Sequence, residues 1–216
     1  MAAAISQTAH GATLLEANRA VIARIRDAVT GVDPAVMVRQ PPAGGWSVAE
    51  VLEHLIVSAD SYLAILESLV KQAGRMTTNG DALSKPTLAG GLLVWSFRSP
   101  RKLPAPGSYK PGRSPRLRVL EEFLQRQEHV GRLITESAGL DWRRVKMRSP
   151  VAPILRMNLG DALTILVTHA ERHAGQIERI LGAVRIGTRK EERGSGWDAL
   201  ARWSMIATSS FLVPRS

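Results

Sequence analysis

The sequence predicts an all-α protein, a four-helix bundle with a long basic insertion between its second and third helices. Of its 216 residues, 44% are hydrophobic but only 5% are aromatic, a composition that favours helices over a β-sandwich. Four long segments repeat apolar residues at helical spacing, and none has the alternation of a strand. These features predict an up-and-down bundle, or a variant with a long crossover between helices two and three.

The first helix is predicted from about Thr8 to Val29. Its apolar residues recur at helical spacing, with arginines between them: Leu14, Leu15, Ala17, Val21, Ile22, Ile25 and Val29. Gly31, Asp33 and Pro34 follow, and residues of these types favour turns, so they are expected to end the helix.

The second helix is predicted from Ser47, its N-cap, to about Gln72. Glu50 stands three residues after the cap and completes a capping box, in which the two residues satisfy each other's backbone N–H groups. Trp46 precedes the cap, so it is expected to pack on Val51 as a hydrophobic staple.

Residues 74–113 differ from the helices around them. Glycine, proline and threonine interrupt this segment, and only the stretch TLAGGLLVWSF is apolar enough for a short helix. The arginine-rich stretch RSPRKLPAPGSYKPGRSPR follows. A connection of this length is either a flexible link or a cap over one end of the bundle, and the sequence leaves both open.

The third helix is predicted to begin with Ser114 as N-cap and Pro115 as its first residue, a favoured start. Gly139 is expected to end it. Its apolar residues form one predicted stripe: Leu117, Leu120, Leu124, Gly131 and Ile134.

The fourth helix is predicted from about Leu159 to Gly182, with Asn158 as its cap and Asp161 favourably placed in its first turn. A later stretch, WDALARWSMIA, is expected to form a separate short helix on the surface.

The domain organisation follows from these helices. We expect one bundle domain over residues 8–183, with residues 74–113 as an inserted loop and short helix. Residues 184–216 then form a C-terminal extension.

Two histidines on the fourth helix indicate a metal site. His169 and His173 are four residues apart, so they lie on one helical face, and that face is otherwise largely apolar: Ala162, Leu166, Gln176, Ile177 and Ile180. Buried imidazoles need partners for both ring nitrogens, and a shared metal ion satisfies one nitrogen of each. The alternative is a pair of buried histidines that are simply hydrogen-bonded.

His54 is the best candidate for a third ligand. It lies in the second turn of a well-capped apolar helix, whereas His10 is near the chain start and His129 faces away from the leucine stripe. Three neutral imidazoles with one or two open positions suit a divalent cation such as Zn²⁺, Ni²⁺, Fe²⁺ or Co²⁺. An open position is typical of a catalytic rather than a structural site.

Composition excludes some functions and disfavours others. The chain has no cysteine, which excludes disulfides and thiolate ligands and fits a cytoplasmic location. No targeting segment or stretch long enough to span a membrane is visible, so a membrane role is not expected. The net charge of +10 allows nucleic-acid binding, but no nucleic-acid motif accompanies it, so this function is disfavoured.

Two ordered motifs resemble the DinB-like superfamily of bacterial metal-binding four-helix bundles, including its DinB_2 and bacillithiol-transferase-like members. They are GWSVAEVLEHL and, far along the chain, THAERHAGQIERIL. The resemblance covers about residues 8–183 and implies that His54, His169 and His173 coordinate the metal at one end of the bundle. It also implies dimerisation through helix faces. Characterised relatives include metal-dependent transferases that use low-molecular-weight thiols and mycothiol-dependent isomerases.

The expected function is therefore that of a metal-dependent transferase or hydrolase acting on a small molecule. The metal would activate a thiol or a water molecule. Gln127, Glu128 and Gln176 are expected near the inward side of their helices, where they could orient the nucleophile or support the ligands. Two alternatives remain: a non-catalytic metal-binding stress or regulatory protein, and a basic helical protein that binds nucleic acid.

Overall fold

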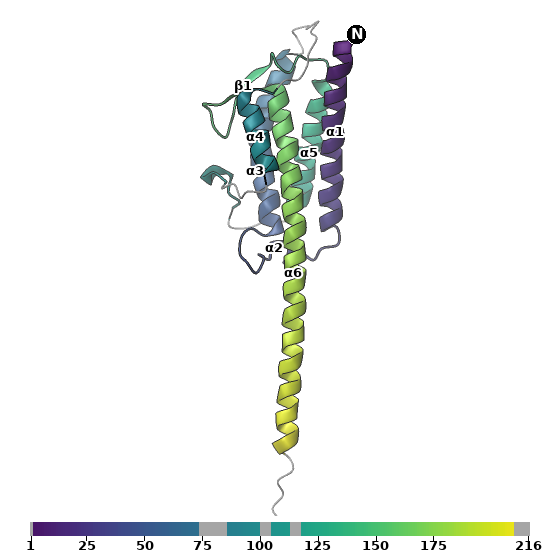
Figure 1. Cartoon of the computed structure of the whole chain (residues 1–216), viewed down its shortest axis with the longest axis vertical. Coiled ribbons are helices and arrows are strands. Elements are labelled where there is room, and N and C mark those ends of the chain that lie inside the picture. Colours follow the sequence, from purple (N-terminus) through teal and green to yellow (C-terminus); the bar gives the residue numbers. More distant parts are fainter. Residues whose placement is uncertain (1, 74–85, 100–104, 113–117, 210–216) are drawn as a thin grey trace, which may run out of the picture.

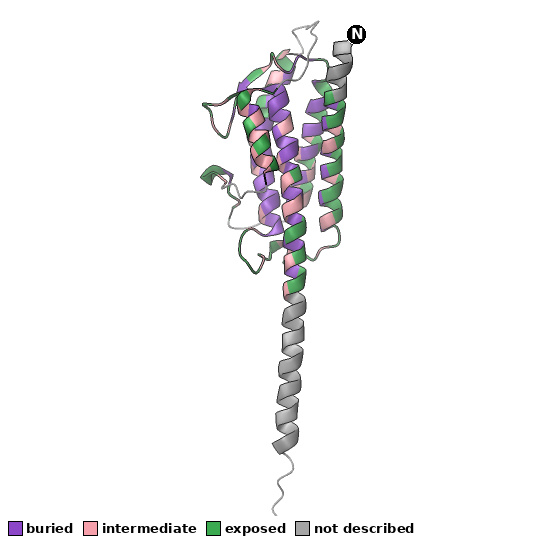
Figure 2. Ribbon diagram, viewed as in Figure 1, coloured by how far each residue is buried: buried purple, intermediate pink, exposed green. Residues whose placement is uncertain are grey.

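The computed structural model describes residues 2–73, 86–99, 105–112 and 118–209, with side chains described between residues 10 and 187 of these ranges. Four long helices form the bundle: α1 (Ala2–Val29), α3 (Val48–Ala73), α5 (Val119–Glu136) and α6 (Leu159–Ser209). Figure 1 shows them side by side, and Figure 2 shows that their inward faces are buried. The predicted all-α fold is confirmed.

The connectivity matches the crossover variant of the bundle. One buried apolar cluster joins the start of α1 and the ends of α3 and α5, including Leu14, Leu66 and Ile134. The other joins the end of α1 and the starts of α3 and α5, including Ile25 and Phe123. Helices α3 and α5 therefore run parallel, so the segment between them must cross the length of the bundle.

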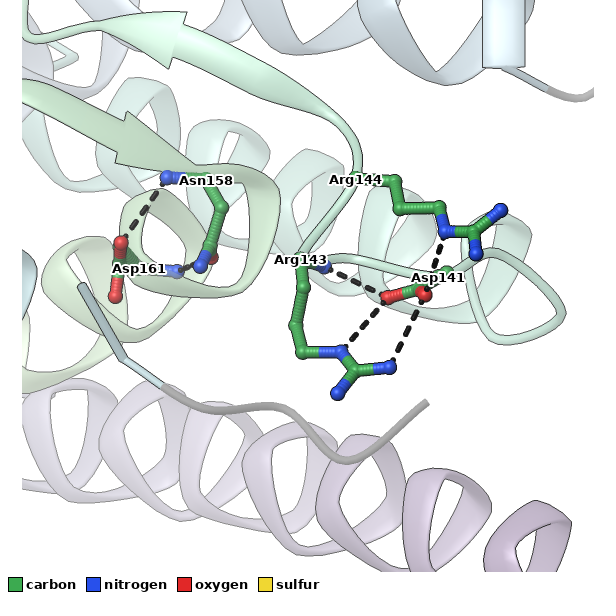
Figure 3. Close-up of polar contacts among 5 residues, drawn as sticks. All are labelled: Asp141, Arg143, Arg144, Asn158 and Asp161. Carbon is green, nitrogen blue, oxygen red and sulfur yellow. Dashed lines mark hydrogen bonds and ion pairs between the residues drawn. The ribbon is translucent and has the colours of Figure 1, made fainter. Parts of the chain in front are cut away.

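Both predicted helix caps are present. At α3, the Ser47 N–H donates to Glu50 Oε2 over 2.7 Å, and the Glu50 N–H donates to Ser47 Oγ over 3.3 Å. At α6, Asn158 and Asp161 exchange the same pair of bonds, over 3.0 and 2.9 Å (Figure 3). These bonds satisfy N–H groups that the first turn of a helix leaves without partners, which is why both helices start where the sequence indicates.

The predicted end of the fourth helix is wrong. Helix α6 does not stop at Gly182 but continues as one helix of 51 residues to Ser209. The left-handed backbone that glycine supplies at many helix ends occurs, among the described glycines, only at Gly31, Gly44 and Gly45. The stretch WDALARWSMIA is therefore the last part of α6 rather than a separate helix.

Four short elements were not predicted: the 3₁₀ turn described below, one helix and two strands. Helix α2 (Pro34–Val38) follows the turn that ends α1, and the carboxylate of Asp33 caps its start by accepting from the Ala35 N–H. The strands β1 (Lys146–Arg148) and β2 (Arg156–Asn158) form an antiparallel hairpin between the predicted third and fourth helices. Strands of three residues are too short to establish an alternating pattern.

The boundaries of two predicted helices shift. Helix α1 begins at Ala2 rather than near Thr8. The predicted cap and first residue of the third helix, Ser114 and Pro115, lie outside the described residues, and α5 begins at Val119. The short helix predicted in the insertion is confirmed as α4 (Leu88–Arg98), and a 3₁₀ turn, η1 (Gly107–Tyr109), follows it. Within the described residues, no helix combines the length and apolar character needed to cross a membrane.

Asp141 holds the turn between α5 and the hairpin. Its buried carboxylate accepts hydrogen bonds from the backbone N–H and the guanidinium of Arg143 and pairs with Arg144 (Figure 3). Burial alone would raise the pKa of Asp141, but the bonds from Arg143 and the charges of both arginines outweigh burial and lower it. The folded protein therefore binds this proton more weakly than the unfolded chain does.

Asp141→Asn is expected to reduce the free energy of unfolding at pH 7 by about 1–2 kcal/mol, because it weakens charge-assisted bonds to partly exposed arginines. A carboxyl with a lowered folded pKa stabilises above its unfolded pKa of about 3.9 and loses that contribution as the pH falls through the folded pKa. Denaturant unfolding should thus show the difference between variant and wild type shrinking below about pH 4. Asp60→Asn, which breaks the exposed ion pair with Arg126, is the control and should change little.

Candidate metal centre

Three imidazole rings meet inside the bundle. His169 Nε2 lies 3.2 Å from His54 Nε2 and 3.1 Å from His173 Nε2. One nitrogen from each ring lies within 4.8 Å of the others. The structure thus brings together the three histidines that the sequence singled out, one from α3 and two from α6.

Local sequence explains why the rings point inward. His169 and His173 are one turn apart on α6, between the buried residues Leu166, Ala170 and Ile177. His54 follows the capped start of α3 and is buried, as is His173, whereas His169 is half-buried. The site lies where the two apolar clusters of the core meet.

Hydrogen bonds made by Nδ1, the ring nitrogen that points away from the cluster, set the tautomers of His54 and His173. His54 Nδ1–H donates to the Tyr109 carbonyl over 2.6 Å, and His173 Nδ1–H donates to Gln176 Oε1 over 2.8 Å. Both acceptors require a proton on Nδ1, so in the neutral ring Nε2 carries a lone pair. These lone pairs point toward His169.

The surroundings keep all three rings neutral. Burial lowers the pKa of His169 well below its usual value, and the charges of neighbouring groups lower it further. Burial also lowers the pKa of His173 to about 3. For His54, burial lowers the pKa, although the bond to the Tyr109 carbonyl opposes this change. Neutral imidazole is the form that coordinates metals, so the cluster is ready for a cation at neutral pH.

The donor set fits a divalent transition-metal ion. His169 Nε2–H could donate to only one neighbour at a time, so without a cation the lone pair on at least one of the other two Nε2 atoms receives no hydrogen bond from His169. Nitrogens at about 2.0–2.1 Å from one ion, at angles of 90–109°, are about 2.8–3.4 Å apart. The separations of His169 Nε2 from His54 Nε2 and His173 Nε2, 3.2 and 3.1 Å, fall inside that interval. Three imidazoles without a carboxylate disfavour Mg²⁺, which prefers oxygen.

Aromatic groups from outside the two ligand helices wall the cluster. The Trp46 ring lies 4.9 Å from the His54 ring, and the Phe97 ring lies 4.9 Å from the His169 ring, measured between centroids. Phe97 belongs to α4, and the Tyr109 carbonyl belongs to η1. The described parts of the insertion therefore pack against the three histidines, as a cap does and a flexible link does not.

Helix α4 is fastened to α6 on both sides of His169. At its start, Asp161 accepts hydrogen bonds from the Thr87 N–H over 3.1 Å and from the Thr87 hydroxyl over 2.8 Å. At its end, the Arg172 guanidinium donates to the carbonyls of Phe97 and Ser99. These contacts hold the Phe97 ring against the His169 ring.

The predicted supporting residues have different positions. Gln176 is hydrogen-bonded to His173. Gln127 is buried in α5, where its backbone carbonyl accepts a bond from Asn18. Glu128 is exposed, so its expected inward position is wrong.

The two remaining histidines lie elsewhere. His129, expected to face away from the leucine stripe, is half-buried, and its Nε2 lies 2.7 Å from Glu67 Oε1. His10 is exposed and packs edge-on against Trp142.

Several residues of the site escaped sequence reasoning. Phe97 and Tyr109 are aromatic residues in an otherwise irregular segment, which is a weak signal. Arg172 lies on another face of the helix from the two histidines, so their spacing gives no signal for it. The role of Trp46 beyond its staple was also missed, since only the fold brings its ring to His54.

Fold and site together define a class, a helical bundle that gathers three histidines from two helices. The chain belongs to the DinB superfamily, whose family model matches residues 17–177. This range includes all three histidines and all of the insertion. No curated protein and no solved structure matches the chain.

Proposed function

We propose that this protein binds one divalent metal ion through His54, His169 and His173 and uses it in a transfer or hydrolysis reaction on a small molecule. The observation that carries the proposal is the convergence of three neutral imidazole nitrogens in a buried site. Membership of the DinB superfamily supports it.

The metal would supply positive charge that favours the anionic, nucleophilic form of a thiol or a water molecule at neutral pH. The protein's own groups have other tasks. The Tyr109 carbonyl and Gln176 hold two imidazoles in the ligating tautomer, the role such partners have in known metal sites. Trp46 and Phe97 shield the centre from bulk water.

The proposed nucleophile is a low-molecular-weight thiol or water, as the family resemblance implies. A non-catalytic metal-binding stress or regulatory protein is the second candidate, because the same three ligands would serve it. Dimerisation stays a prediction.

Metal analysis tests the site. Purified protein is reconstituted with Zn²⁺, Ni²⁺ or Fe²⁺ and then desalted. Wild type is expected to keep about one ion per chain. The variants His54→Ala, His169→Ala and His173→Ala are expected to lose the ion, because two imidazoles hold a metal much more weakly than three. His129→Ala, a histidine outside the cluster, is the control and should retain the ion. Equal metal content in all five proteins would contradict the site.

A turnover assay separates the two functions. Metal-loaded wild type is mixed with a small thiol and a model electrophile, or with a model ester, and product is followed over time. An enzyme shows product formation above that of free metal, which disappears in His169→Ala. Metal binding without turnover across these substrates favours the non-catalytic protein.

A further inference from the structure

We propose that the β1–β2 hairpin and the start of α4 form a second binding site, a groove for a small phosphate-bearing molecule. The groove has a volume of about 450 Å³ and is lined by Thr87, Lys146, Met147, Arg148, Arg156 and Met157. It lies at the start of α6, more than two turns before His169, so it is separate from the metal centre.

Strand register places three cations on one face of the hairpin. Arg148 and Arg156 are directly opposite each other, and Lys146 is two residues from Arg148, so all three side chains lie on the same side. All three are exposed, whereas Met147 and Met157 on the other side are buried. Like charges directly opposite each other destabilise a strand pair. A bound anion would remove this repulsion.

No described carboxylate neutralises these three cations. None of them takes part in an ion pair within the described residues. Arg148 donates to the Pro153 carbonyl over 3.1 Å, which orients the guanidinium and leaves its positive charge in place.

The other charged side chains close to the hairpin are bonded to partners other than these three cations. Arg143 and Arg144 turn to Asp141, away from the Asn158–Asp161 pair (Figure 3). Asp161, the carboxylate next to Thr87, is buried and accepts bonds from Thr87 and Asn158. The exposed face of the groove is therefore positively charged.

The chemistry of the groove favours a phosphate group. A guanidinium group can donate two parallel hydrogen bonds to the oxygens of one phosphate. Two arginines and one lysine carry three positive charges, which a phosphate dianion neutralises more fully than a ligand with a single carboxylate. The groove is larger than one phosphate group and has room for the molecule that carries it. Among the described residues, no aromatic side chain lines it, so these residues provide no base stacking of the kind that single-stranded nucleic acid uses.

Calorimetry with inorganic pyrophosphate on the metal-free full chain tests the site. The double variant Arg148→Gln/Arg156→Gln is expected to weaken binding at least about tenfold, since two charge-assisted contacts are lost. Arg19→Gln/Arg26→Gln, which removes the same charge from exposed positions of α1, is the matched control and should change affinity less than about twofold. Equal weakening in both double variants would overturn the proposal, because it would show only an effect of net charge.

Two further ligands fix the chemical class. Succinate, a dicarboxylate, is expected to bind more weakly than pyrophosphate, and equal affinity would overturn the assignment to phosphate. A short DNA duplex is expected to show no loss of affinity specific to Arg148→Gln/Arg156→Gln. DNA binding that is tighter than pyrophosphate binding and is lost in that variant would assign the groove to nucleic acid and overturn the proposal.

Thermal unfolding gives an independent readout with a single substitution. At low salt Arg156→Gln is expected to be no less stable than wild type, because it removes a like-charge pair. Pyrophosphate should raise the unfolding temperature of wild type and raise that of Arg156→Gln by less. A variant that keeps the full pyrophosphate-induced rise would contradict the site. None of these measurements depends on the metal centre.

Discussion

Excess Zn²⁺ is expected to raise the free energy of unfolding of the wild type by about 4 kcal/mol at a free metal concentration a thousandfold above Kd, and to leave His169→Ala almost unchanged. His169 Nε2 is the nitrogen within about 3 Å of both others, so its removal breaks the donor set at its centre. Denaturant unfolding with and without metal measures the difference.

The metal-free proteins provide the internal control for this prediction. Without metal, the free energies of unfolding of wild type and His169→Ala should differ by no more than about 1 kcal/mol, because lost packing against Phe97 is offset by removal of a polar ring that can satisfy only one of its two neighbouring nitrogens. His129→Ala should keep the whole metal-induced gain. A gain of similar size in His169→Ala would place the ion elsewhere.

Gly90→Ala is expected to destabilise the protein by about 2–3 kcal/mol, which is large for the addition of one methyl group. Helices α4 and α6 approach so closely at this residue that a Cβ atom would lie 2.2 Å from Asp161 Cγ and 2.3 Å from Asp161 Oδ1. Asp161 cannot retreat without losing its bonds to Thr87 and Asn158. The same methyl group therefore disturbs the starts of two helices.

Gly91→Ala is the matched control for this prediction. The added Cβ would lie 3.9 Å from Pro86 Cβ, which is an ordinary van der Waals contact. The higher helix propensity of alanine should therefore raise the free energy of unfolding by about 0.5–1 kcal/mol. Denaturant unfolding of both variants should give effects of opposite sign. Equal effects would mean that α4 does not pack tightly on Asp161.

The features predicted correctly depend on neighbouring residues. The capping pairs Ser47–Glu50 and Asn158–Asp161 each span three residues, and the pair His169–His173 spans one turn, so chain geometry fixes both relations. His54, predicted as the third ligand because it was the one remaining histidine on an apolar stretch of a well-capped helix, lies beside His169 and His173; its coordination of a metal stays a prediction.

The features predicted incorrectly depend on contacts between distant segments. In α5, the leucine stripe was assigned to the core, but Phe123 and Val130 on an adjacent face are fully buried while Leu120 and Leu124 are half-buried. Two overlapping apolar runs share this helix, and only packing against α1 and α3 decides between them. Choosing the wrong run also placed Glu128 inside.

The attachment of α4 has a consequence for how such proteins can diverge. Helix α6 carries His169 and also Asp161 and Arg172, the two side chains that hold α4. The position of Phe97 relative to His169 therefore depends on these contacts and not on the length of the connecting chain. Deletions or additions in the connections before Thr87 or after Ser99 would leave the wall of the centre in place. Relatives could thus change the lengths of these connections while Phe97 stays beside His169.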